Sequence, residues 1–111
     1  MELSKYMRDG VTVVSLEGDL DSHSAPEAHS DLAELLPGAG SMLLDLHRLR
    51  YMSSAGLRML LLTYRRARDE NVRMALAAIP DEINALMAAT GFLDAFTVTS
   101  TVSEGVRELA T

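Results

Sequence analysis

The sequence predicts a single α/β domain over residues 1–111, with a mostly parallel five-stranded mixed sheet, an antiparallel first strand and about four helices. Three observations predict this fold. Short apolar runs alternate with segments of helical periodicity, the connections between them are short, and 48% hydrophobic residues in 111 are enough to form one core. No linker, internal repeat or low-complexity tract divides the chain.

The N-terminal part predicts a β-hairpin followed by a helix. Met1–Met7 and Val11–Leu16 are apolar-rich segments joined by Arg8-Asp9-Gly10, and an Asp-Gly pair between such segments is typical of a hairpin turn. Residues 18–22 then form a polar loop. Ser24 and Glu27 have the spacing of a capping box, which opens a helix that runs through Leu36.

The rest of the chain predicts alternating strands and helices. Met42–Leu46 and Val72–Ala77 are short apolar runs typical of central buried strands, and a helix from the Ser53-Ser54 pair to about Asp69 lies between them. A third helix opens at Pro80-Asp81 and ends at Gly91, Ala95–Thr99 forms an edge strand, and the spacing of Thr101 and Glu104 caps a last helix.

Composition and charge exclude several classes of function. The net charge of -6 argues against a general nucleic-acid binder, and the absence of cysteine excludes disulfides and thiolate sites. The apolar runs are far shorter than the ~20 residues of a membrane span, and the N-terminus has no apolar signal core, so we expect a cytoplasmic protein without direct membrane insertion. The histidines (23, 29 and 47) do not have metal-ligand spacing, and the Gly-x-Ser-x-Gly elbow of serine hydrolases is missing, so we expect no metal, cofactor or enzymatic activity.

The most informative segment is the serine pair at the start of the second helix. Ser53 or Ser54 should be the N-cap, with its oxygen facing the free N–H groups and the positive end of the helix dipole. A phosphate would be well accommodated there, although the same serine could simply cap the helix, a role worth about 1 kcal/mol. The pair lies in the one basic segment, residues 41–75, which holds seven arginines against three acids. These arginines either form an ordinary solvated face or help to dock a partner.

Two further residues near the serines invite a functional interpretation. Gly56 lies in the first helical turn, where glycine costs about 1 kcal/mol relative to alanine, so we expect close approach by a neighbouring element or by a partner. For most of the seven methionines, the simplest interpretation is that they fill the hydrophobic core. Met59 lies off the predicted inward stripe of Leu57, Leu60, Leu61 and Tyr64, so an exposed thioether there could belong to a partner-binding surface.

Two motifs resemble the STAS domain family, the sulphate transporter and anti-sigma factor antagonist domain, in its stand-alone bacterial form. Gly18-Asp19-Leu20-Asp21 before a helix resembles the family's Gly-x-Leu-Asp element. Asp45-Leu46, followed by residues 51–57 (Tyr-Met-Ser-Ser-Ala-Gly-Leu), resembles the family's strand and its Asp-Ser-Ser-Gly-Leu motif. The resemblance covers the whole chain and implies a single STAS domain over residues 1–111.

The resemblance assigns roles to particular residues. Ser54 corresponds to the family's phosphoacceptor serine and Gly56 to its motif glycine, while Asp21 matches a loop acid that helps dock the kinase in relatives. The chain departs from the motif at Ser53, where many relatives have Asp, and at Ala55, where they have a second serine. Together with the residues above, the expected partner-binding set is Asp21, Ser53, Ser54, Gly56, Arg58 and Met59.

The implied function is that of an anti-sigma factor antagonist in a partner-switching system. The unphosphorylated protein would bind an anti-sigma factor that is also a serine kinase of the histidine-kinase-like ATPase type, and so release a sigma factor. Phosphorylation of Ser54 would end this binding, and a PP2C-type serine phosphatase would restore it. Two alternatives stay open: a STAS subunit of a membrane lipid-transport ATPase system, and a scaffold of a stress-signalling assembly.

Overall fold

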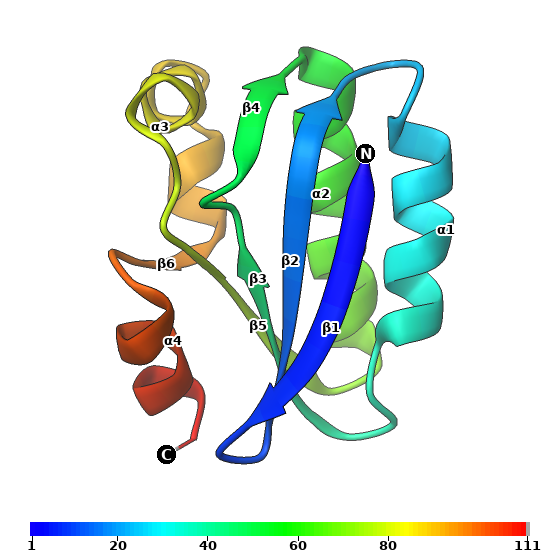
Figure 1. Ribbon diagram of the computed structural model, residues 1–111, viewed down its shortest axis with the longest axis vertical. Helices are drawn as coiled ribbons and strands as arrows, with labels where there is room; N and C mark the ends of the chain where they lie inside the picture. The colour runs from blue at the N-terminus through cyan, green and yellow to red at the C-terminus, as the bar shows by residue number, and fades with distance from the viewer. Residues whose placement is uncertain (111) are drawn as a thin grey trace.

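The computed structural model describes residues 1–110, and its elements follow the predicted order around one sheet (Figure 1). The strands are β1 (Glu2–Arg8), β2 (Val11–Leu20), β3 (Gly40–Asp45), β4 (Leu49–Met52), β5 (Val72–Ala77) and β6 (Thr97–Thr99). The helices are α1 (Ala25–Leu35), α2 (Ser54–Asp69), α3 (Asp81–Ala89), the 3-10 turn η1 (Phe92–Ala95) and α4 (Val102–Leu109).

The sheet is mixed, as predicted. Its strand order is β1-β2-β3-β5-β6, in which β1 pairs with β2 antiparallel and the other neighbours pair in parallel. The hairpin turn contains Asp9 and Gly10, both with positive φ, which agrees with the Asp-Gly signal.

The sheet has a sixth, short strand, β4, which the sequence analysis did not predict. The segment Gly18-Asp19-Leu20 is the end of β2 and not a polar loop, so β2 extends beyond its pairing with β3. The free edge of this extension pairs in parallel with β4, with Leu20 opposite Met52, and a bulge lies between Gly18 and Asp19. Pairing of this kind depends on a distant strand, which local sequence patterns do not record.

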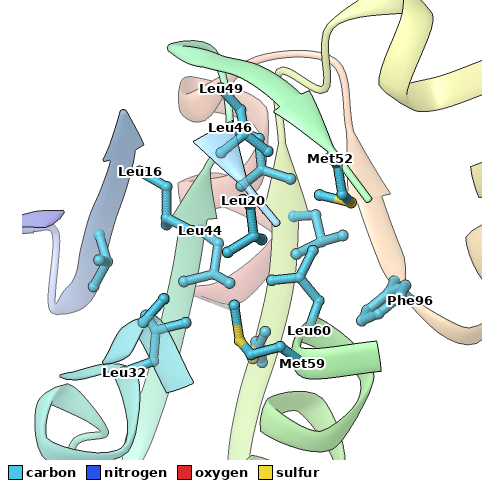
Figure 2. Close-up of a cluster of buried hydrophobic side chains, with 14 of the residues drawn as sticks. Leu16, Leu20, Leu32, Leu44, Leu46, Leu49, Met52, Met59, Leu60 and Phe96 are labelled. Carbon is cyan, nitrogen blue, oxygen red and sulfur yellow. The ribbon is translucent and has the colours of Figure 1, made fainter. Parts of the chain in front are cut away.

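Helices cover both faces of the sheet (Figure 1). A large cluster of buried side chains packs between one face and α1, α2 and α3, and a smaller one packs between the other face and α4. The large cluster includes Leu20, Leu44 and Leu60, and it continues to Met52 at the end of β4 (Figure 2). This packing fixes the start of α2 against the ends of β2 and β4.

Two local predictions need correction, and the cap predicted at Thr101 is confirmed. Ser24 has helical backbone angles and makes no side-chain cap bond, so the predicted capping box does not form at α1. The last strand begins at Thr97, since Phe92–Ala95 forms a 3-10 turn. At α4 the Thr101 hydroxyl does accept from the Glu104 N–H, but the Glu104 carboxylate accepts from Ser100 N and not from Thr101 N.

Candidate functional site

Ser53 is the N-cap of α2. Its backbone is extended and its hydroxyl oxygen accepts a hydrogen bond from Gly56 N at 3.4 Å, while its carbonyl accepts one from Leu57 N. Its own N–H donates to the carbonyl of Leu20 at 2.9 Å, which ties the helix start to the end of β2. The sequence left the cap open between two serines, and the structure assigns it to Ser53.

Ser54 is the first residue of α2, and its side chain is exposed. Among residues 1–110 no group forms a hydrogen bond with its hydroxyl. The first turn of α2 contains no acidic residue, so no side chain of that turn offsets the positive end of the helix dipole. A phosphate on this hydroxyl would therefore find solvent space and a favourable field at the same point.

Asp21 lies beside the serines because β2 and β4 end together. Leu20 and Met52 are register partners, so Asp21 and Ser53 both follow a strand end at the same edge of the sheet. The Asp21 Oδ1 accepts from Ser24 N at 3.0 Å and from His23 N at 2.9 Å, so Asp21 takes over the capping that the sequence assigned to Ser24. The Ser24 backbone N–H lowers the pKa of the Asp21 carboxyl below its usual 3.8, and the His23 N–H acts in the same direction. Asp21 thus holds the loop before α1 in shape.

Gly56 is buried, and the group that approaches it closely is the backbone of Leu20 in the same chain. A Cβ at this position would lie 2.6 Å from the carbonyl oxygen of Leu20, 2.9 Å from Leu20 Cγ and 3.2 Å from Met52 Cγ. Of the two readings that the sequence allowed, the close approach of a neighbouring element accounts for this glycine. It lets α2 begin directly against β2, and in this way it places Ser54 beside the Asp21 loop.

The expectation of an exposed Met59 is wrong, since only 4% of the residue is exposed. Met59 belongs to the large core cluster, where Figure 2 shows it beside Leu60. The reason is that α1 packs along α2 and buries a second flank of the helix, in addition to the stripe that faces the sheet. Met59 reaches solvent only at the floor of a shallow groove between the two helices.

An exposed surface of mixed character surrounds Ser54 on α2, and we call it the α2 surface. Leu62 is 44% exposed and separates two hollows, both of which Arg58 lines. The first hollow, about 620 Å³, is lined by Ser54, Ala55, Arg58, Leu61, Leu62, Arg65 and Phe92. The second, between α1 and α2, is lined by Ser22, Ala25, Pro26, His29, Ala55, Arg58, Met59 and Leu62.

The structure thus brings together most of the predicted site residues and adds some that the sequence analysis missed. Asp21, Ser53, Ser54 and Arg58 lie at one end of the molecule, with Gly56 and Met59 beneath them. Leu62 and Phe92 were missed. The position of Leu62 off the predicted inward stripe was a usable signal, whereas nothing local to Phe92 indicates that its turn folds back toward α2.

The part of the chain that the structure describes contains neither a candidate metal site nor a candidate membrane span. Within residues 1–110, no group of three or more histidine and acidic side chains could hold a metal ion. In the same range, no helix has both the length and the apolar character needed to cross a membrane.

Comparison with known proteins agrees with these observations. The STAS domain family model matches residues 2–105. A Bordetella bronchiseptica protein, BtrV, named as a candidate anti-sigma factor antagonist, is 32% identical over 99 residues, covering 88% of this chain and 85% of that protein. A solved STAS domain protein from Planctomyces limnophilus superposes with a TM-score of 0.87 at 18% identity, covering 98% of both chains. The anti-sigma factor antagonist SpoIIAA, solved in its unphosphorylated form, superposes with a TM-score of 0.70 at 16% identity over 96% of both chains. At such identities the two solved structures establish the fold alone.

Proposed function

The chain belongs to the STAS domain family, and we propose that it acts as an anti-sigma factor antagonist that is switched by phosphorylation of Ser54. In its unmodified form it binds an anti-sigma factor, which is also a serine kinase, and thereby releases a sigma factor. Support for the antagonist role comes from the relative in Bordetella bronchiseptica. The α2 surface and the Asp21 loop together form the proposed binding surface.

One observation carries the choice of Ser54 as the acceptor. Its hydroxyl is exposed and has no hydrogen-bond partner within residues 1–110, whereas the Ser53 oxygen is half-buried and already caps the helix. A kinase can reach the Ser54 oxygen without opening the structure. Attack on Ser53 would first break its hydrogen bond to Gly56.

The chemistry of the switch belongs to the partners. The kinase transfers the γ-phosphoryl group of ATP to the Ser54 oxygen, so that ADP is released and the hydroxyl proton leaves. A serine phosphatase of the PP2C type hydrolyses the ester, returning the hydroxyl and inorganic phosphate. The added group has about -1.5 to -2 charges and must be desolvated in a packed contact. A hundredfold loss of affinity needs only about 2.8 kcal/mol, which such a group can supply.

Mass spectrometry after incubation with the kinase and ATP tests the acceptor. The kinase to use is an anti-sigma factor kinase of the histidine-kinase-like ATPase type from the same organism. We expect phosphate on Ser54 and none on the Ser54→Ala variant. The matched control is Ser53→Ala, which loses a cap worth about 1 kcal/mol but keeps the acceptor and should be labelled. Phosphate on Ser53 alone, or labelling of Ser54→Ala at the wild-type rate, would overturn the assignment.

The extent of the binding surface has a separate test. Asp21→Ala and Arg58→Ala should each weaken binding of the unmodified protein to the kinase in a calorimetric titration. Because Asp21 also orders its own loop, Asp21→Asn is the informative companion: it keeps an acceptor oxygen for Ser24 N and removes only the charge. Wild-type affinity in both Arg58→Ala and Asp21→Ala would show that the interface lies elsewhere.

A further inference from the structure

We propose that Arg58 is the intramolecular partner of a phosphate on Ser54, and that its capture by the phosphate removes a cation on which the unmodified protein relies to bind its partner. This inference rests on the proposed function of Ser54. It adds a mechanism to the switch: phosphate does not only repel the partner but also occupies the arginine that the partner contacts.

The spacing of the two residues is the first argument. Ser54 and Arg58 are four residues apart on α2, so their Cβ atoms lie about 5–6 Å apart on the same face of the helix. Helical side chains lean toward the N-terminus, so the long Arg58 side chain can reach back to Ser54, and both residues line the first hollow of the α2 surface. An anion four residues before a cation is also the favourable order for such a pair.

The second argument concerns the contacts that Arg58 already makes within residues 1–110. Several arginines of the basic segment have carboxylate partners: Arg48 pairs with Glu17, Arg50 with Asp19 and Arg66 with Glu70. Arg58 is exposed and has no ion pair or hydrogen bond with any residue in the range 1–110. A guanidinium forms parallel, charge-assisted hydrogen bonds to phosphate, and here no existing pair has to be broken first.

The third argument concerns the position of Arg58 on the proposed binding surface. Arg58 lines both hollows of the α2 surface, and the exposed Leu62 lies between them. A partner that fills either hollow therefore contacts both Leu62 and Arg58. Because a desolvated guanidinium needs a counter-ion, the partner should present a carboxylate to it. Partner carboxylate and Ser54 phosphate then compete for the same group.

The ion pair can be tested without any kinase, on full-length protein carrying phosphoserine at position 54 installed by codon suppression. The second pKa of the phosphate, ordinarily near 6, is measured by phosphorus NMR titration. We expect it to be lower in wild type than in Arg58→Ala by about 0.2 to 0.4 of a pH unit, and Arg58→Lys should recover most of the difference.

The matched control is Arg65→Ala, which removes an exposed arginine that lines the same hollow. It lies eleven residues after Ser54, about 16 Å along the helix, and should leave the phosphate pKa unchanged. The neighbouring titratable groups Asp21, His23 and His29 are present in every variant, so their influence cancels in the comparison. Equal phosphate pKa values in wild type and Arg58→Ala would overturn the ion pair.

The competition is tested by binding of the anti-sigma kinase to four proteins: wild type and Arg58→Ala, each unmodified and phosphorylated. Loss of a charge-assisted contact should weaken binding of the kinase to the unmodified Arg58→Ala protein about tenfold. Phosphorylation should then weaken partner binding of this variant less than that of wild type, by a factor of about 1.5 to 2, because the partner can reclaim Arg58 at the cost of the ion pair that the phosphate makes with it. An equal effect of phosphate in both backgrounds would overturn the competition. If phosphate fails to weaken wild-type binding, it is the proposed function that fails, and the NMR comparison still decides the ion pair.

Discussion

Replacement of Gly56 by alanine should loosen the attachment of α2 to β2, although alanine is the better helix former. The new Cβ would lie 2.6 Å from the Leu20 carbonyl oxygen, about 0.8 Å inside the 3.4 Å of ordinary contact. That oxygen is backbone, and it already accepts the hydrogen bond from Ser53 N, so it cannot turn aside as a side chain could.

The magnitude follows from two opposed contributions. Helix propensity favours alanine over glycine by about 1 kcal/mol. Overpacking against a fixed neighbour costs about 1–3 kcal/mol, and a backbone contact this short belongs at the upper end. We therefore expect a net loss of about 2 kcal/mol in the free energy of unfolding, which for a domain of this size lowers the melting temperature by roughly 10 °C. Chemical denaturation followed by circular dichroism measures this change in the free energy of unfolding.

Gly105 of α4 offers a matched control, because it is also a buried helical glycine. Its Cβ would meet Leu43 Cδ1 at 2.6 Å and Thr99 Oγ1 at 2.9 Å, both at the ends of side chains. These ends can rotate, so Gly105→Ala should cost less than about 1 kcal/mol. If Gly56→Ala is as stable as wild type, or if both variants lose the same amount, the argument from a rigid backbone contact is wrong.

Three further predictions follow from single residues. Ser54→Asp should keep the wild-type circular dichroism spectrum, gain about 0.3–1 kcal/mol in the free energy of unfolding from an acid at the helix N-terminus, and lose affinity for its partner. A destabilised variant would contradict the conclusion that the Ser54 side chain makes no structural contact. The lowered pKa of Asp21 means that its charge stabilises the fold at pH values above 3.8 and that this contribution disappears as the pH falls through the folded-state pKa. The difference in unfolding free energy between wild type and Asp21→Asn should therefore be largest near neutral pH and shrink in acid, and a difference independent of pH would refute this. Ala78 has a φ of 57°, so Ala78→Gly should relieve left-handed strain and raise the free energy of unfolding by about 0.5 kcal/mol in a urea titration. A variant less stable than wild type would show that this strain is absent.

Local sequence patterns determined the order of the elements other than β4 and η1, and most of their bounds. The Asp-Gly turn predicted the β1–β2 hairpin, and the apolar run around Leu44 predicted a central parallel strand. The serine pair predicted the start of α2 to within one residue. Each of these signals reports an energy that is decided within a few residues: a turn conformation, a free N–H at a helix end, or one apolar face.

Contacts between distant segments decided the rest of the site. Strand β4 forms because β2 extends beyond its pairing with β3 and leaves a free edge for β4 to pair with. Met59 is buried because α1 packs along α2. The neighbour of Gly56 is the carbonyl of Leu20, 36 positions earlier in the chain. No pattern near these residues encodes such partners, since their energy comes from backbone pairing and close packing that exist only when the sheet is assembled. The sequence by itself therefore determined which serines begin the helix. The tertiary structure decided that Ser53 is held as the cap, while Ser54 is presented to solvent beside Arg58 and the Asp21 loop.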